Sequence, residues 1–336
     1  MRFGLTSEQR DFADALDGLL TTADAVAANR SWAAGDHAPG LELWQRLAEL
    51  GVTALTVPEE HGGFGSTPTD LVVAFERLGY HGAPGPLVES VALAPTLLAG
   101  TAPALLSGLA EGSVRATFAV PPVTPYALDA DIATDVFLLD GETLSRAMLI
   151  EERGTSVSKP TPLQSVDPSR HLFEVTAAES VGSVDEAARE RALDLATLAC
   201  AASLLGAGER MLDETVTYLG QRRQFGRVIG EYQSLKHAAA DVRVALDFTR
   251  PLLLGAAGEL ALGAPESGRA VSAAKVAATD AAALAARTGL QLHGAIGYTL
   301  ECDLSVWFLR SQALTGCWGT QAAHRARVLE SLTRSR

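Results

Sequence analysis

The sequence predicts a mainly α-helical protein with a small β domain in its middle. Apolar residues recur at helical spacing near both ends of the chain, which favours helices there. Between them, short apolar runs separated by Pro, Gly and Asp are typical of strands. We therefore expect an N-terminal helical domain at residues 1–114, a shortened β domain at 115–180 and a C-terminal four-helix domain at 181–336.

The composition limits the classes of protein to which the chain can belong. The chain has 336 residues, of which 47% are hydrophobic and 20% charged, so it can bury a large core in two or three domains. Its formal net charge of -13 and lack of an extended basic face argue against binding to nucleic acid or to an anionic membrane. The N-terminus starts an amphipathic helix capped by Thr6 or Ser7 and has no signal-peptide core, so a cytoplasmic protein is expected.

The three cysteines predict no special chemistry. Cys200, Cys302 and Cys317 are scattered and lack C-x-x-C spacing, which indicates reduced thiols rather than disulfides or zinc ligands. No metal site is predicted.

Four helices are expected in the first domain, at residues 5–28, 41–50, 67–80 and 87–111. Gly51 follows the second helix and can adopt the left-handed conformation that ends many helices. A glycine-rich loop spans Val57 to Gly65, and its run Glu59-Glu60-His61 contains groups able to transfer protons. A tight loop with solvated charges is the preferred interpretation of that run.

The middle domain is predicted from four runs with strand character between residues 115 and 178, namely TFAV, DVFLL, AMLI and HLFEV. About sixty residues is near the lower size limit for an independent core, so we expect this domain to lean on the flanking helices. Residues 178–183 have the character of a linker.

The last domain is expected to contain helices at residues 184–219, 231–262, 266–293 and 319–334. Ser183 and Glu186 form an S-x-x-E pair that predicts a capping box at the first helix. One apolar stripe follows that helix: Leu195, Leu198, Ala202, Leu205, Leu212, Val216 and Leu219. Pro251 removes one hydrogen bond from the second helix and should bend or divide it.

The stretch from Tyr218 to Gln233 is the strongest candidate for a binding site. Arg222, Arg223 and Arg227 crowd a helix end in an otherwise acidic chain, and clustered guanidinium groups suggest an anion, usually phosphate. On spacing alone, a solvated basic turn remains the preferred interpretation.

A second candidate is the loop from Gln291 to Tyr298. Gly294 and Gly297 permit close approach of the backbone to a ligand or another chain, although a plain helix terminator is preferred. His293 is expected to satisfy the end of the helix rather than to act in catalysis.

Three motifs occur in order on the expected elements: P-E-E-H-G-G-F-G at 58–65, R-R-Q-F-G at 222–226 and Q-L-H-G-A-I-G-Y at 291–298. With them the chain resembles the acyl-CoA dehydrogenase family over nearly its whole length. It looks like a short form, similar to the non-catalytic-type subunit of heteromeric actinobacterial members. The resemblance implies an acyl-CoA dehydrogenase-like fold, bound FAD, a C-terminal bundle that dimerises and a flavin between subunits.

The resemblance also implies cofactor-binding residues. Arg222 matches the arginine that reaches the FAD pyrophosphate of the neighbouring subunit, Gln224 a polar residue beside that phosphate, and Phe225 an aromatic residue near the adenosine. Further matches lie at the next helix start, in the second loop and at a late glycine-threonine element: Tyr232, Gln233, Gln291, Leu292, His293, Gly294, Ala295, Gly319, Thr320 and Gln321. The implied reaction removes a proton α to a thioester while hydride leaves the β carbon for the flavin, which gives a trans-2-enoyl-CoA.

No catalytic base matches the family. Many members carry a carboxylate just before the late glycine-threonine pair, where this chain has Trp318, and others carry it where this chain has Ala196. Glu301 lies nearby, but it resembles a structural glutamate that faces an arginine such as Arg310. Asp194 is two residues from the alternative position, and on a helix that offset points about 160° away.

The middle domain also departs from the family. Between Ala116 and Asp135 the segments that cover the flavin ring are missing, whereas residues 167–171 resemble a later part of the domain. We therefore expect one subunit of a heteromeric (α2β2) acyl-CoA dehydrogenase, whose homologous partner supplies the base and the lid. Its substrate is an acyl-CoA, and steroid-derived CoA thioesters are suggested by analogy.

Two alternatives stay open. The first is a self-sufficient homodimeric acyl-CoA dehydrogenase with an atypical base such as Glu301. The second is a cofactor-free helical assembly or regulatory protein of the same fold. No nucleic-acid or membrane partner is expected in any of these cases.

Overall fold

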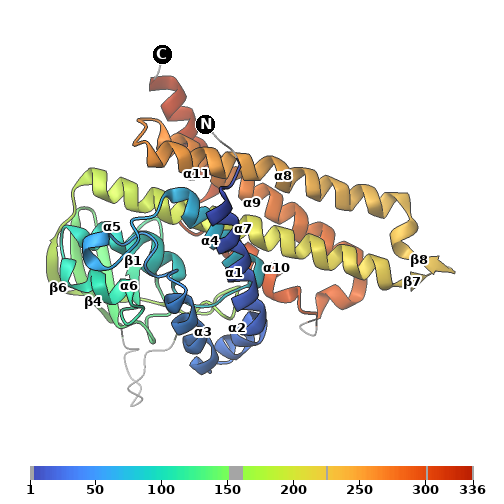
Figure 1. Cartoon of the computed structure of the whole chain (residues 1–336), viewed down its shortest axis with the longest axis horizontal. Coiled ribbons are helices and arrows are strands. Elements are labelled where there is room, and N and C mark those ends of the chain that lie inside the picture. The colour runs from blue at the N-terminus through green and yellow to red at the C-terminus, as the bar shows by residue number, and fades with distance from the viewer. Residues whose placement is uncertain (1–3, 151–161, 225, 300–301, 335–336) are drawn as a thin grey trace.

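The computed structural model describes residues 4–150, 162–224, 226–299 and 302–334. Three long helices run side by side through it (Figure 1): α7 (Glu186–Gln221), α8 (Gln233–Ala261) and α9 (Ser267–His293). The N-terminal helices pack across α7, and the small sheet lies near the start of α7.

The N-terminal part is helical, as predicted, but it has more breaks. Its elements are α1 (Ser7–Thr22), α2 (Ala25–Ala33), α3 (Ala38–Glu49), η1 (Glu59–His61), α4 (Pro68–His81), the π-turn η2 (Val88–Leu93), α5 (Ala94–Ala99), η3 (Pro103–Leu105) and α6 (Leu106–Ala110). The single helix predicted at 5–28 is wrong, because Asp24 adopts a left-handed conformation and its carboxylate caps α2. The helix predicted at 87–111 is also divided, with Pro95 and Pro103 each at the start of a new segment.

The β part contains one four-stranded sheet in the order β1-β3-β4-β6. Its strands are β1 (Ala116–Ala119), β3 (Asp135–Asp140), β4 (Thr143–Leu149) and β6 (Val175–Ser183), and β2 (Ala127–Leu128) pairs separately with β5 (Leu172–Phe173). β1 is parallel to β3, and the other neighbours are antiparallel. The linker predicted at 178–183 is wrong, because those residues pair with β4.

The sheet leans on the helices, as expected for so small a domain. Phe118 and Phe137 stack with ring centroids 5.0 Å apart, and both belong to the buried cluster that includes the apolar face of α7. The sheet and the helices therefore share one core.

The C-terminal part adds α10 (Ser305–Leu314), which was not predicted, and α11 (Gln321–Arg334) to the three long helices. The predicted capping box is wrong: Asp185 is the N-cap of α7 and accepts a hydrogen bond from the Ala188 amide at 2.8 Å. The apolar stripe of α7 is buried except at Val216, which is 51% exposed. Pro251 lies inside α8, and the helix continues past it undivided.

By length and composition α7 is apolar enough to cross a membrane. However, 89% of its apolar window is buried inside the protein, as in the core helix of a globular fold.

Candidate functional site

The arginine turn protrudes from the far end of the helical bundle (Figure 1). Arg222 is the C-cap residue of α7. A short hairpin follows, in which the two-residue strand β7 (Arg223–Gln224) pairs with the two-residue strand β8 (Arg227–Val228). Arg222, Arg223 and Gln224 are exposed, and within the described ranges neither Arg222 nor Arg223 forms an ion pair. The predicted site residue Phe225 lies outside the described residues. The turn therefore presents two free guanidinium groups to solvent.

Arg227 and Tyr232 are in contact where the chain passes from the hairpin into α8. The Arg227 guanidinium lies over the Tyr232 ring, 3.8 Å from its centroid, and Tyr232 is the N-cap residue of α8. Gln233 is the first residue of that helix and is exposed. A cation–π contact thus links β8 to the start of α8.

The Gln291 loop lies at the same end of the bundle, held there by His293. The His293 ring stacks on Tyr218 of α7 with centroids 4.4 Å apart, and the Tyr218 hydroxyl donates to the His293 carbonyl at 3.4 Å. His293 is buried and its Nδ1–H donates to the Gly289 carbonyl at 2.8 Å, which supports a structural role. Next to it, Gln291, Gly294 and Ala295 are exposed and Leu292 is partly buried. The fold thus brings the two binding motifs together.

The late glycine-threonine element lies elsewhere. Thr320 caps α11 by accepting from the Ala323 amide at 3.2 Å, and Gln321 donates to Asp280 Oδ1 of α9 at 2.8 Å. At 1.5 Å per residue, Asp280 is about 20 Å from His293 along α9. The structure therefore does not bring Thr320 to the arginine turn within one chain.

A cleft of about 450 Å³ separates the β part from the end of α10. Its walls come from residues 123–126, 164–166, 312–313 and 315–317, together with Leu172. Arg170 lies at its inner end, partly buried, with Nη2 3.5 Å from Cys317 Sγ. This is a mostly apolar space with one cation at its base.

Glu89 lies in a smaller cavity that Arg170 also lines, and it was not predicted from the sequence. Glu89 is 1% exposed, and among the described residues neither of its carboxylate oxygens has a hydrogen-bond partner. Burial raises the pKa of Glu89, and the nearby charge of Arg170 opposes that rise. The only signal in the sequence is a lone acid within the apolar run V-E-S-V-A-L.

The acidic loop near the N-terminal domain is a tight turn. Glu59 and Glu60 are exposed on η1, and a Cβ on Gly63 would lie 2.0 Å from the Val57 carbonyl oxygen. This close approach requires glycine, which supports the loop interpretation over an acid–base site.

Comparison with known proteins decides the family. Residues 6–105 match the family model of the acyl-CoA dehydrogenase N-terminal domain, and residues 186–333 match that of the C-terminal domain. The chain is 32% identical over 307 residues to acyl-CoA dehydrogenase IpdE2 of Mycobacterium tuberculosis (strain ATCC 25618 / H37Rv), covering 90% of this chain and 91% of the relative. The chain belongs to the acyl-CoA dehydrogenase family.

Solved structures agree on the fold. A structure described as a Tcur3481-Tcur3483 steroid ACAD G363A variant superposes with a TM-score of 0.84 at 22% identity, covering 98% of each chain. The ChsE4-ChsE5 complex from Mycobacterium tuberculosis gives a TM-score of 0.79 at 21% identity, covering 100% of each chain. The predicted acyl-CoA dehydrogenase fold is confirmed.

In this member of the family, the two positions at which the resemblance predicts a base are buried, and neither side chain can accept a proton. Ala196 is 0% and Trp318 2% exposed. The Trp318 carbonyl accepts from His324 Nε2 at 3.0 Å and from Thr197 Oγ1 at 3.3 Å. Burial, helped by the charge of Lys275, lowers the pKa of His324 to about 4, so this imidazole is neutral and donates its Nε2 proton to Trp318.

The remaining candidate acids are engaged or undescribed. Asp194 is 4% exposed and forms an ion pair with Arg327, with Oδ2 3.1 Å from Nη2. Arg310 forms its ion pair with Asp167, and Glu301 lies outside the described residues. The Asp194 carboxylate is therefore paired with a residue of α11.

Proposed function

We propose that this chain is one subunit of a heteromeric acyl-CoA dehydrogenase that shares FAD with a homologous partner. One contrast carries the proposal: the exposed arginine turn and the Gln291 loop meet at one end of the bundle, while Ala196 and Trp318 occupy both base positions. The chain therefore offers groups for a cofactor tail, and the partner supplies the base that removes the α proton of the acyl-CoA.

The arginine turn fits the pyrophosphate of FAD. Arg222 and Arg223 are free of ion pairs within the described ranges, and a guanidinium pairs well with phosphate oxygens. Gln224 and Gln291 are exposed amides on the two adjoining segments, and Tyr232 and Gln233 begin the next helix. When bound, FAD would accept the hydride from the β carbon, and these residues would hold the dinucleotide and orient it.

An exposed apolar stripe on α8 supports a partner subunit. Val244, Phe248 and Leu252 are 52%, 72% and 46% exposed and recur every four residues, so they lie on one face of the helix. Beside them, a groove of about 540 Å³ runs between α7 and α8. Exposed apolar patches of this kind mark interaction surfaces. The occupant we propose is the bundle of a related acyl-CoA dehydrogenase, and structures with this fold include the ChsE4-ChsE5 complex.

Coexpression with a longer acyl-CoA dehydrogenase encoded beside this chain tests assembly. We expect the chain alone to be colourless and the copurified complex to be yellow and active. Phe248→Asp should weaken assembly at least about tenfold, because it places a charge in an apolar interface. Analytical ultracentrifugation measures this change.

Phe64→Asp is the matched control, since Phe64 is 57% exposed on a different surface, and it should leave assembly unchanged. A yellow protein with one flavin per subunit when purified alone would contradict the need for a partner. A complex that stays colourless would instead favour the cofactor-free alternative.

Arg222→Ala tests the cofactor contact. We expect FAD to dissociate more readily from the complex, with a loss of about 1.5 to 3 kcal/mol, because a charge-assisted hydrogen bond to phosphate disappears. Flavin fluorescence during FAD titration of the apo complex measures the change. Arg325→Ala removes an exposed arginine of α11 and serves as control. Equal FAD affinity in both variants would defeat the assignment of Arg222.

A further inference from the structure

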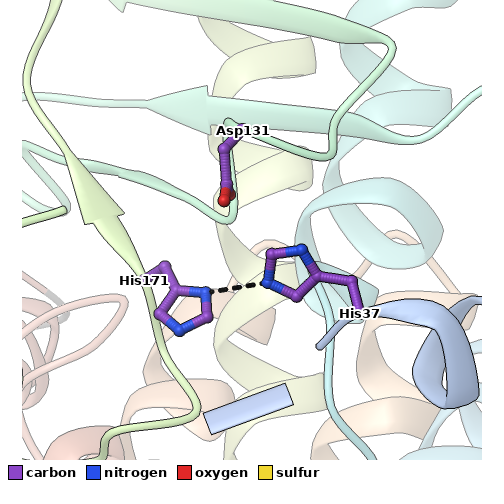
Figure 2. Close-up of side chains that lie close together, drawn as sticks. All are labelled: His37, Asp131 and His171. Atoms are coloured by element: carbon purple, nitrogen blue, oxygen red, sulfur yellow. Dashed lines mark hydrogen bonds between the residues drawn. The ribbon is translucent and has the colours of Figure 1, made fainter. Parts of the chain in front are cut away.

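Two imidazoles and a carboxylate converge between the N-terminal helices and the β part (Figure 2). His37 is the N-cap residue of α3, Asp131 lies in the loop between β2 and β3, and His171 directly precedes β5. One ligand atom from each of the three lies within 4.8 Å of the others. Figure 2 shows the Asp131 carboxylate directed toward the gap between the two rings. Three segments that are far apart in the sequence thus meet at one point.

The spacing of the two ring nitrogens matches that of two ligands on one metal ion. His37 Nε2 and His171 Nδ1 are 3.3 Å apart, within reach of a hydrogen bond when no ion is bound. Two nitrogens bound to a tetrahedral zinc ion at about 2.0 to 2.1 Å are themselves roughly 3.3 to 3.4 Å apart. The rings therefore already stand at the separation that a shared cation requires.

Neighbouring groups hold His37 and His171 in place. The His37 ring packs against Trp32 with centroids 4.6 Å apart. Asp129 Oδ1 accepts from the Trp32 indole at 3.2 Å and from the His171 backbone amide at 3.2 Å. The ring contact orients His37, and the backbone hydrogen bond fixes the position of His171. The pair of histidines is therefore positioned by the fold.

Asp129 provides a second, independent observation. It is 0% exposed, its Oδ1 is 3.5 Å from His171 Nδ1, and its Oδ2 has no hydrogen-bond partner among the described residues. A buried carboxylate with a free oxygen beside two imidazoles is an environment that favours a further cation.

We propose that His37 Nε2, His171 Nδ1 and the Asp131 carboxylate bind a divalent transition-metal ion of the zinc class. Two imidazoles and one carboxylate suit zinc and its neighbours, whereas calcium and magnesium prefer oxygen ligands alone. Asp131 is exposed, so a fourth position is open to water. The ion links α3 to the β2–β3 loop and to β5, next to Arg170 at the base of the cleft. Its role is to fix the β part against the N-terminal helices, independently of the proposed sharing of FAD.

Titration of the chelator-treated full chain with zinc chloride tests the site by calorimetry and by thermal unfolding. We expect about one equivalent to bind and the midpoint of unfolding to rise, because the ion binds the folded state. His37→Ala should weaken binding about 100-fold or more and remove the rise. Asp131→Asn, a change at an exposed residue, should weaken binding while leaving the helical circular dichroism signal intact.

His61→Ala is the matched control, because His61 lies on η1 away from the cluster, and it should bind zinc as the unaltered chain does. Cobalt absorption identifies the ligands, since thiolates give an intense near-ultraviolet band that a nitrogen and oxygen site lacks. Zinc binding that is absent from the unaltered chain, or that is as tight in His37→Ala and Asp131→Asn as in the unaltered chain, would overturn the proposal. A thiolate band would do the same by assigning the metal to the cysteines.

Discussion

Replacing Arg310 with Met is expected to lower the free energy of unfolding by about 3 to 5 kcal/mol. Arg310 forms an ion pair with Asp167, whose side chain is 3% exposed, and donates to Ser169 Oγ at 2.8 Å and to the Ala83 carbonyl at 3.1 Å. Met keeps much of the volume but leaves the Asp167 carboxylate buried without its cation. Urea unfolding followed by circular dichroism measures the loss.

Acidic pH should reduce the difference in unfolding free energy between the unaltered chain and Arg310→Met. Burial by itself raises the pKa of Asp167, but the Arg310 guanidinium and the Ser169 hydroxyl outweigh it and hold that pKa below its ordinary value. A lowered folded-state pKa stabilises the protein above the unfolded value of about 3.9, and the contribution fades as the pH falls through the folded value. The difference in unfolding free energy between the unaltered chain and Arg310→Met should therefore be largest near neutral pH.

Arg46→Met is the control for the loss of an ion pair as such. Arg46 pairs with Glu42 one turn away on α3, and both side chains are exposed, so this change should cost no more than about 0.5 kcal/mol. If Arg310→Met were as mild as Arg46→Met, the buried pair would not be what joins α10 to the 167–169 segment.

Periodicity predicts the long helices of this fold well and its irregular parts poorly. Helices α4, α7, α8 and α9 end within a few residues of their predicted limits, because each carries a long apolar face. By contrast, α10 was missed, since its run S-V-W-F-L-R-S-Q-A-L has no clear polar face and is set by the burial of Trp307 and Leu314. β6 resembled a linker because most of its residues are exposed, and only pairing with β4 makes it a strand.

The candidate site, too, could be predicted from the sequence only in part. The arginine turn and the Gln291 loop were predicted, because each motif is contiguous in the sequence. Their meeting through Tyr218 and His293 was not, since it depends on how α7 packs against α9. Glu89 and the cluster of His37, Asp131 and His171 were missed for the same reason. Burial and convergence are properties of the tertiary fold, and spacing along the chain does not reveal them.

Gly206→Val is expected to destabilise the protein by about 3 kcal/mol, although propensity alone predicts the opposite. Valine is a better helix former than glycine, so the change should slightly stabilise an isolated α7. At the crossing with α4, however, a Cβ on Gly206 would lie 1.9 Å from the Glu76 carbonyl oxygen, and one on Gly79 would lie 2.2 Å from the Ser203 carbonyl oxygen. The two backbones touch there, so the added side chain must push the helices apart.

Steric overlap outweighs helix propensity, so Gly206→Val should lower the free energy of unfolding. The overlap involves backbone atoms on both helices, and no flexible side chain can move to relieve it. Separation of α4 from α7 would also disturb Glu76, which forms ion pairs with Arg77 and Arg250. Gly18→Val is the matched control: Gly18 is exposed within α1, nothing lies within 4 Å of the position that its Cβ would take, and stability should change by less than about 0.5 kcal/mol. Equal midpoints of urea unfolding for the two variants would show that α4 and α7 do not cross in backbone contact at Gly206.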